Sequence, residues 1–237
     1  MFVNLSQNHF KIHALHGRKE AFMCVILIKN KGIKAPSKDI LRKCWDRNPD
    51  GAGFMYVSPQ SNNVILSKGY MDFNDFYRQV SAFSKNDIVV YHFRISTQAG
   101  VNPEMTQPFP LTKDKERTKA LDLTCKVGIA HNGIIPCTSN GDTEYSDTAL
   151  FITEYLPHIL HKAEDFNSSA VMDIIKELIG RSKFVFLHAS GRIDTIGEFT
   201  ERDGILYSNM LWDYSFGYEF TKHHVNLTSK YIESLVR

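Results

Sequence analysis

The chain has 237 residues, of which 28 are Lys or Arg and 26 are Asp or Glu, so its formal net charge is +2. This near balance argues against a protein whose main partner is nucleic acid or an anionic membrane. Hydrophobic residues make up 43% of the chain and aromatic residues 12%, which is enough for a packed core and excludes a disordered or fibrous chain. The length is typical of one large α/β or α+β domain.

The cysteine pattern and the lack of long apolar segments indicate a cytoplasmic protein. Four cysteines at irregular spacing do not make a disulfide framework, and none lies in a Cys-x-x-Cys pair. They are Cys24, Cys44, Cys125 and Cys137. No stretch approaches the roughly 20 consecutive apolar residues of a membrane helix, and the first residues lack the apolar core of a secretory signal.

The domain is expected to begin at residue 24. Residues 1–23 are mostly polar and rich in His, Lys and Arg, and we interpret them as a leader, a propeptide or a segment translated from a wrong start. Cys24 to Ile28 is an apolar, β-branched run that predicts a buried strand. No linker divides the rest of the chain, so we predict a single domain over residues 24–237.

The first half of this domain alternates helices and strands. Ser37 is the expected N-cap of a helix with one apolar face. After a turn at 48–51, strands at 53–57 and 64–66 form a predicted hairpin. A second helix is expected to begin at Asp72. A strand at 87–95 then leads into a long loop at 98–111 and a charged, exposed stretch at 112–118.

The second half contains a strand at 127–131, two helices and three further strands. The first helix is expected to be capped by Ser146 and the second to begin at Ser169. The last strands are predicted at 184–187, 192–198 and 205–207. The order lacks regular βαβ alternation and therefore indicates an α+β fold in which helices cover antiparallel sheets.

Five short motifs lie at predicted strand ends or in turns, where functional sites usually occur. They are Met23-Cys24, Arg47 to Gly53, His92 to Thr97, His131-Asn132-Gly133 and Ser146-Asp147-Thr148. Each alone has an ordinary structural explanation, such as a buried thiol, a turn, an ion pair or a helix cap. No single motif identifies a function.

The order and spacing of the five motifs together resemble the class II glutamine amidotransferase domain, an N-terminal-nucleophile (Ntn) hydrolase, over about residues 23–160. The turn at Asn48-Pro49-Asp50-Gly51 also resembles stand-alone amidotransferase-like proteins of bacterial viruses, in which case the location would be the host cytoplasm. The resemblance implies a four-layer αββα sandwich with two antiparallel sheets. It also implies cofactor-free and metal-free hydrolysis of the side-chain amide of glutamine, with release of ammonia.

The resemblance assigns a role to each motif. Cys24 is the nucleophile that forms a thioester, and its own α-amine is the base. The side-chain amide of Asn132 and the backbone N–H of Gly133 form the oxyanion hole. Arg94 binds the α-carboxylate and Asp147 the α-ammonium of glutamine or of another γ-glutamyl amide.

Further residues are assigned supporting roles. Thr97 and Gly51 are expected to shape the same pocket. Arg47 is expected to orient the terminus at Cys24. His92 and His131 are expected to be structural, and no residues have the spacing of metal ligands.

The chain departs from the family pattern first at its start. Cys24 is not terminal in this sequence, and an amide nitrogen cannot act as the base. The protein cleaves its own leader, or translation begins at Met23, or the protein is inactive. We favour a start at Met23, because Arg18 to Ala21 can be encoded AGA-AAG-GAG-GCN, which contains the ribosome-binding sequence AAGGAGG.

Two further departures concern the glutamine site and the fate of ammonia. Gln98 and Gln107 stand where amidotransferases often carry His in the loop that covers glutamine, and Ile95 stands where an aromatic residue is common. We expect no synthase domain in the chain, which leaves an ammonia-accepting partner protein, simple hydrolysis or γ-glutamyl transfer. The alternatives are an enzyme for another γ-glutamyl compound, such as a peptide or polyamine conjugate, and a catalytically silent regulatory protein that acts on a host factor.

Overall fold

A computed structural model describes residues 23–96, 100–138, 142 and 144–213. It is an α+β protein with two antiparallel sheets of 7 and 4 strands, as the order of elements predicts. Most of the predicted leader lies outside the described residues, as do Thr97 and Gln98. Within the described residues, no helix is long and apolar enough to cross a membrane.

The larger sheet is built around the strand that begins after Cys24. In spatial order its strands are β10 (Thr200–Arg202), β11 (Ile205–Tyr207), β1 (Val25–Lys29), β4 (Val89–Phe93), β2 (Ala52–Val57), β3 (Val64–Tyr70) and β6 (Asp122–Cys125). The first residue of β1, Val25, pairs with the last residue of β4, Phe93, which also pairs with Ala52 at the start of β2. The start of β1, the end of β4 and the start of β2 therefore lie at one end of the sheet.

The smaller sheet is centred on β7 and β8. In spatial order its strands are β5 (Phe109–Pro110), β7 (Val127–Asn132), β8 (Lys183–His188) and β9 (Ile193–Ile196). Their buried residues alternate between two hydrophobic clusters, as expected for strands with both faces covered.

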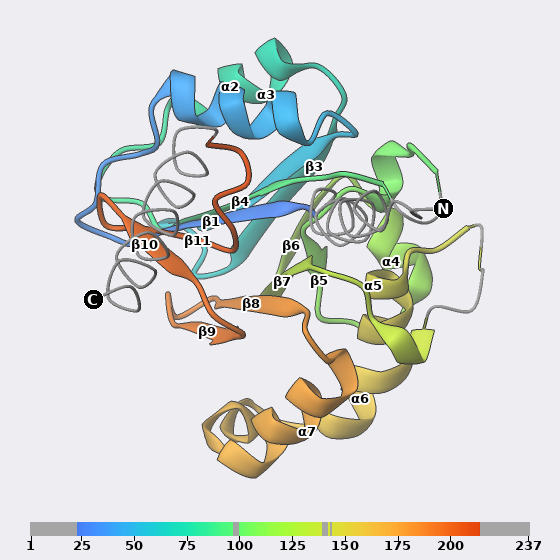
Figure 1. Cartoon of the computed structure of the whole chain (residues 1–237). Helices are drawn as coiled ribbons and strands as arrows, with labels where there is room; N and C mark the ends of the chain where they lie inside the picture. The colour runs from blue at the N-terminus through green and yellow to red at the C-terminus, as the bar shows by residue number, and fades with distance from the viewer. Residues whose placement is uncertain (1–22, 97–99, 139–141, 143, 214–237) are drawn as a thin grey trace, which may run out of the picture.

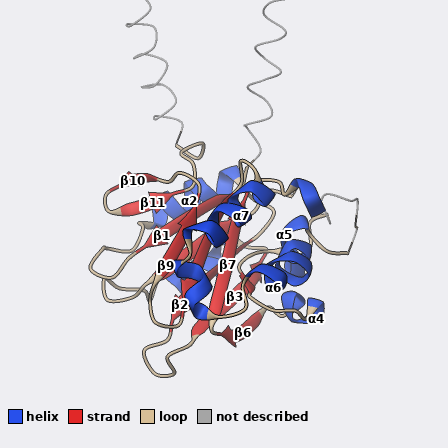
Figure 2. Ribbon diagram, turned by 90° about the horizontal axis from the view of Figure 1, so that it is seen from below, coloured by secondary structure: helices blue, strands red, loops and turns tan. Residues whose placement is uncertain are grey.

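Helices cover the outer face of each sheet, as Figure 1 shows with the sheets seen near their edges. Helices α2 (Lys38–Arg47) and α3 (Phe73–Val80) pack on the larger sheet, with Trp45 and Phe76 in their shared core. On the smaller sheet the chain runs through α5 (Asp147–Leu150), the π-helical turn η3 (Phe151–Tyr155), α6 (Leu156–Ile159), the 3₁₀ turn η4 (Ala163–Asn167) and α7 (Ser169–Ile179). Figure 2, turned by 90°, shows these helices in front of the strands.

A third hydrophobic cluster lies between the two sheets. Ile26 and Met55 of the larger sheet pack there against Ala130 and Val185 of the smaller one. Gly128 of β7 permits the close approach, because a Cβ at this position would lie 2.6 Å from the sulfur of Met55. The two sheets thus share one continuous apolar core.

The helix caps follow the sequence predictions, whereas the segment between β4 and β6 does not. Ser37 and Asp72 accept hydrogen bonds from the first turns of α2 and α3. The predicted loop at 98–111 contains the 3₁₀ turn η1 (Pro103–Met105) and β5, and the stretch predicted as exposed forms α4 (Lys115–Lys119) with Thr118 fully buried. Lys113, Asp114, Glu116 and Arg117 are exposed, as predicted. The elements η1, β5 and α4 were not predicted, because they are too short to give a periodic pattern. The 3₁₀ turn η2 (Pro136–Thr138) follows β7.

Candidate active site

Backbone pairing brings the first three motifs together at one end of the larger sheet. The N–H of Arg94 donates to the carbonyl of Gly51 at 2.8 Å, and the N–H of Asp50 donates to the carbonyl of Arg94 at 3.1 Å. The thiol of Cys24 lies beside the next residue, Ile95, whose N–H is 3.5 Å from the sulfur. These contacts place the 47–53 turn and the end of β4 next to the predicted nucleophile.

The alternation of side chains along the strands turns the predicted site residues into the space between the sheets. Ile26 faces the inter-sheet core, and Cys24 lies two residues earlier on the same side. Val90 faces the same core, and Arg94, four residues later, points to the same side of the strand. On the smaller sheet, Asn132 follows Ala130 by the same rule.

One pocket contains four of the predicted residues. It is a cavity of about 340 Å³ including the open solvent at its mouth. Its walls are Cys24, Arg94, Ile95, Met105, Gln107, His131, Gly133, Ser146, Asp147 and Thr148. The structure therefore brings Cys24, Arg94, Gly133 and Asp147 together although they come from separate parts of the sequence.

Of the remaining predicted residues, the described ones, which are Arg47, Gly51 and Asn132, do not line this pocket. Arg47 ends α2, and Thr97 lies outside the described residues. Gly51 has a φ of 112°, and a Cβ there would lie 2.7 Å from the Thr106 side chain. It therefore shapes the backbone that holds Arg94 and does not contribute a wall. Asn132 is fully buried beside the pocket.

Burial keeps the Cys24 thiol protonated. It raises the pKa of the thiol to about 11, and the nearby charge of Asp147 also raises it, whereas the Ile95 backbone contact and the Arg94 charge lower it. About one thiol in a thousand is then ionised at pH 8. A reaction at this sulfur needs a base that is close enough to take its proton.

The pocket also contains a buried cation and a buried anion. Arg94 is 5% exposed; burial lowers its pKa, and the charges of Asp50, of Asp147 and of the thiolate form of Cys24 raise it. Asp147 is 7% exposed, and its carboxylate accepts hydrogen bonds from the N–H of Thr148 at 2.7 Å and of Ile135 at 2.8 Å. These donors fix the direction of the carboxylate at the start of α5.

A polar network forms the wall behind Asp147. Gln107 accepts a hydrogen bond from the N–H of His131 at 2.6 Å and donates to the hydroxyl of Thr148 at 3.3 Å. The ring Nδ1 of His131 lies 2.7 Å from the same hydroxyl. Gln107 is buried in this wall and lines the pocket. Thr148 belongs to the Ser146-Asp147-Thr148 motif but was given no role of its own. Met105 was missed, because nothing in its local sequence marks a pocket wall.

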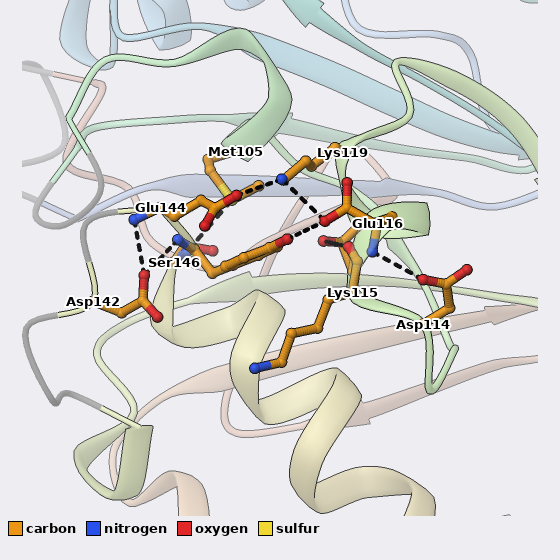
Figure 3. A network of polar contacts seen from close by, with 10 residues as sticks. Met105, Asp114, Lys115, Glu116, Lys119, Asp142, Glu144 and Ser146 are labelled. Carbon is orange, nitrogen blue, oxygen red and sulfur yellow. Dashed lines mark hydrogen bonds and ion pairs between the residues drawn. The ribbon is translucent and has the colours of Figure 1, made fainter.

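A second network outside the pocket holds the segment that leads into α5 (Figure 3). Lys119 of α4 donates to Glu116 at 3.1 Å and to Glu144 at 2.6 Å, and the hydroxyl of Tyr145 donates to Glu116 at 2.5 Å. The N–H of Ser146 is 3.4 Å from the sulfur of Met105. Helix α4 therefore anchors the residues just before Asp147.

Two residues that follow β11 reach the site from far along the chain. The Asn132 amide donates to the hydroxyl of Ser208 at 2.9 Å, and the Asn209 amide donates to the carbonyl of Cys24 at 2.8 Å. Ser208 lies 76 residues after Asn132 in the sequence, and Asn209 lies 185 residues after Cys24. No sequence motif marks Ser208 or Asn209.

His92 connects the two sheets. Its Nε2 donates to the backbone carbonyl of His131 at 3.0 Å, so the proton of the neutral ring is on Nε2. Burial lowers the pKa of His92 to about 3, and burial lowers the pKa of His131 as well. Within the described residues, no group of three or more His, Cys, Asp or Glu could hold a metal ion.

Comparison with known proteins adds no relative: no family model matches the chain, and no curated protein matches it. The chemistry of the pocket is therefore argued from its own residues.

Proposed function

We propose that the protein is an N-terminal-nucleophile hydrolase with the four-layer αββα architecture of that class, and that it releases ammonia from the side-chain amide of glutamine. The observation that carries this proposal is the single pocket that contains Cys24, Arg94 and Asp147. A thiol, a guanidinium and a carboxylate at one small site match the three polar parts of a free amino acid with a side-chain amide.

Substrate recognition rests on the two buried charges. The planar fork of Arg94 suits a bidentate contact with the α-carboxylate, and Asp147 is an acceptor for the α-ammonium group. Both side chains are almost fully covered, and charges in such places are stabilised by opposite charges. A ligand with both groups fits this pair better than a neutral amide.

The reaction begins with transfer of the thiol proton of Cys24 to its own α-amine, whose pKa lies near 8. The sulfur then attacks the amide carbon, and the carbonyl electron pair becomes an oxyanion stabilised by the Gly133 N–H and the Asn132 amide. Collapse of this intermediate breaks the C–N bond of the amide. The protonated α-amine of Cys24 donates its proton to the departing ammonia. Water resolves the thioester to glutamate and free thiol, with the amine again as the base.

The proposal requires that Cys24 carry a free amine. A chain translated from Met23 loses its Met before a small residue, so its mass begins at Cys24. We expect this chain to release ammonia from glutamine and the chain from Met1 to be about 10²- to 10⁴-fold slower, the range that a general base typically contributes to the rate.

Substitution of single cysteines tests the nucleophile. Cys24→Ala is expected to abolish ammonia release and labelling by a glutamine-analogue electrophile, whereas Cys137→Ala, at an exposed thiol, retains both. Intact mass identifies the start of each chain and the site of the adduct. A trimmed chain that is neither labelled nor active would overturn the proposal in favour of a silent binding protein.

The leaving group is tested with a panel of γ-glutamyl amides. Faster turnover of a γ-glutamyl peptide or polyamine conjugate than of glutamine would retain the Cys24 chemistry and change the substrate. Ammonia release that rises when an acceptor protein is added would indicate the partner proposed for a stand-alone amidotransferase domain.

A further inference from the structure

We propose that Ser208 and Asn209 are positioning residues. Ser208 holds the side chain of Asn132 in the oxyanion hole, and Asn209 holds the backbone of the nucleophile Cys24. The inference rests on the proposed function and adds to it two residues that no motif includes. Both follow β11 directly, and each makes a side-chain hydrogen bond to a different part of the site. Neither lines the pocket, so both act through their neighbours.

Ser208 is fixed by the backbone of β1. Its N–H donates to the carbonyl of Ile26 at 3.0 Å, and its hydroxyl oxygen accepts from the N–H of the same residue at 2.9 Å. Lys183 donates to the carbonyl of Ser208. Ser208 is 1% exposed. Its buried hydroxyl is therefore held in one position relative to Asn132.

The Ser208 hydroxyl holds one end of the Asn132 amide, and the other end makes no hydrogen bond within the described residues. Asn132 is 0% exposed, and its Oδ1 has no hydrogen-bond partner among the described residues. A hydroxyl both donates and accepts. A half-turn of the amide therefore keeps the contact, with Ser208 as the donor to Oδ1, and gives Nδ2 the position that lacks a partner.

This second orientation suits catalysis. An unsatisfied buried polar group destabilises the folded protein, and a negatively charged oxygen next to Nδ2 removes that penalty as it forms. An oxyanion hole works because its donors are already aimed when charge develops. In this second orientation the Ser208 hydroxyl donates to Oδ1 of Asn132 and so holds Nδ2 in the position that meets the oxyanion.

Asn209 fixes the backbone of the nucleophile. Its Oδ1 accepts from the N–H of Leu211 at 3.1 Å, and its Nδ2 donates to the carbonyl of Cys24 at 2.8 Å. The two contacts require opposite ends of the amide, so its orientation is determined. Cys24 precedes β1, whose first pair with β4 is Val25 with Phe93. Asn209 thus holds the residue that precedes the paired strand.

The test uses the chain that begins at Cys24. Ser208→Ala is expected to lower kcat about 10- to 100-fold with KM within about twofold, because the loss falls on the transition state. Single-turnover acylation of Cys24 by glutamine is expected to slow by the same factor. Alkylation of the same thiol by iodoacetamide forms no oxyanion and is expected to stay unchanged. Asn209→Ala is expected to slow acylation about 10-fold.

Two variants separate positioning from general destabilisation. Ser58→Ala removes a hydroxyl from a serine that is also buried, at 3% exposure, but that caps the turn between β2 and β3; it is expected to keep full kcat. Ser208→Thr keeps the hydroxyl and is expected to recover most of the lost kcat. Thermal unfolding of each variant verifies that it is folded.

The outcomes distinguish this inference from the proposed function. An active unsubstituted chain whose Ser208→Ala variant has the same kcat, or whose acylation and alkylation fall together, would overturn the positioning role and leave the amidotransferase proposal intact. An unsubstituted chain that begins at Cys24 and is never acylated by glutamine would overturn both.

Discussion

Arg94 carries a positive charge at a position where its side chain is 5% exposed. Asp50 and Asp147 lie close enough to raise its pKa against the effect of burial. Two carboxylates near one guanidinium favour its charged form before a ligand arrives, and burial limits the movement of the side chain. A carboxylate ligand then binds to a group that has already lost its freedom to rotate, which reduces the entropy cost of binding.

We predict that Arg94→Lys weakens substrate use although the charge is retained. Lysine cannot make two parallel hydrogen bonds to one carboxylate, and a lost charge-assisted hydrogen bond is worth about 1.5–3 kcal/mol. kcat/KM for glutamine should fall about 10- to 100-fold, with most of the change in KM. Steady-state kinetics check this. Arg42→Lys, in an exposed ion pair with Asp46, is the matched control, and equal effects of the two substitutions would contradict the assignment.

At the scale of elements, the position of Asp147 depends on α4. The carboxylate of Glu144 and the hydroxyl of Tyr145 hold the pKa of Lys119 above its usual value, and the same lysine bridges to Glu116 of its own helix. Isolated surface ion pairs contribute little to global stability. This network instead affects the short segment before α5, because it holds that segment at two points.

We predict that Lys119→Met raises KM severalfold and leaves the melting temperature nearly unchanged. Without the lysine, the residues before Asp147 lose their link to α4, so the substrate must order them when it binds. Because screening weakens exposed ion pairs, 1 M salt should raise the KM of the unsubstituted chain and have less effect on the variant. Lys43→Met, which removes an exposed ion pair to Asp39 of α2, should change neither. A large fall in melting temperature would instead show that the network stabilises the whole fold.

The sequence predicts those elements that have a strong repeating pattern. The apolar run of β1 and the capped helix after Ser37 are recognisable because burial imposes a period on many residues at once. The three-residue strand β10 and the five-residue α4 give too few residues for a period to show, and both were missed. Their positions depend on contacts with distant parts of the chain, which local propensity does not encode.

The same reason limits prediction of the site. Cys24, Arg94 and Asp147 were found because motif order places them together, and the pocket contains all three. Ser208 was missed because its contact with Asn132 is made across 76 residues by a side chain common in ordinary turns. Gln107 stands where the resemblance places a residue of the loop that covers glutamine, and its buried side chain lines the pocket.

At the scale of the whole molecule, the two sheets are joined beside the pocket by a polar contact as well as by their apolar core. His92 of the larger sheet donates from Nε2 to the carbonyl of His131 in the smaller sheet. The other nitrogen of His92, Nδ1, is buried and has no partner among the described residues. Protonation would place a charge on that nitrogen, next to the positive charge of Arg94, which also lowers the pKa of His92.

The junction should therefore weaken in acid. The pKa of His92 is lowered to about 3 in the folded protein and is about 6.5 in an unfolded chain. Below pH 6.5 the unfolded chain binds a proton that folded His92 refuses, so stability is fully present above pH 6.5 and declines as the pH falls toward 3. His131 and His188, whose pKa values burial also lowers, act in the same direction.

We predict that His92→Gln removes one part of this pH dependence. Glutamine can still donate to the carbonyl of His131 but does not titrate. Between pH 7.5 and 5.5 the unsubstituted chain should lose about 1.4 kcal/mol more unfolding free energy than the variant, the value for one histidine that stays neutral when folded. Urea unfolding at both pH values measures the difference. His158→Gln, at an exposed position of α6, should behave like the unsubstituted chain. Parallel pH profiles for the chain and its His92→Gln variant would mean that His92 titrates normally, and the link between the sheets would then be absent in solution.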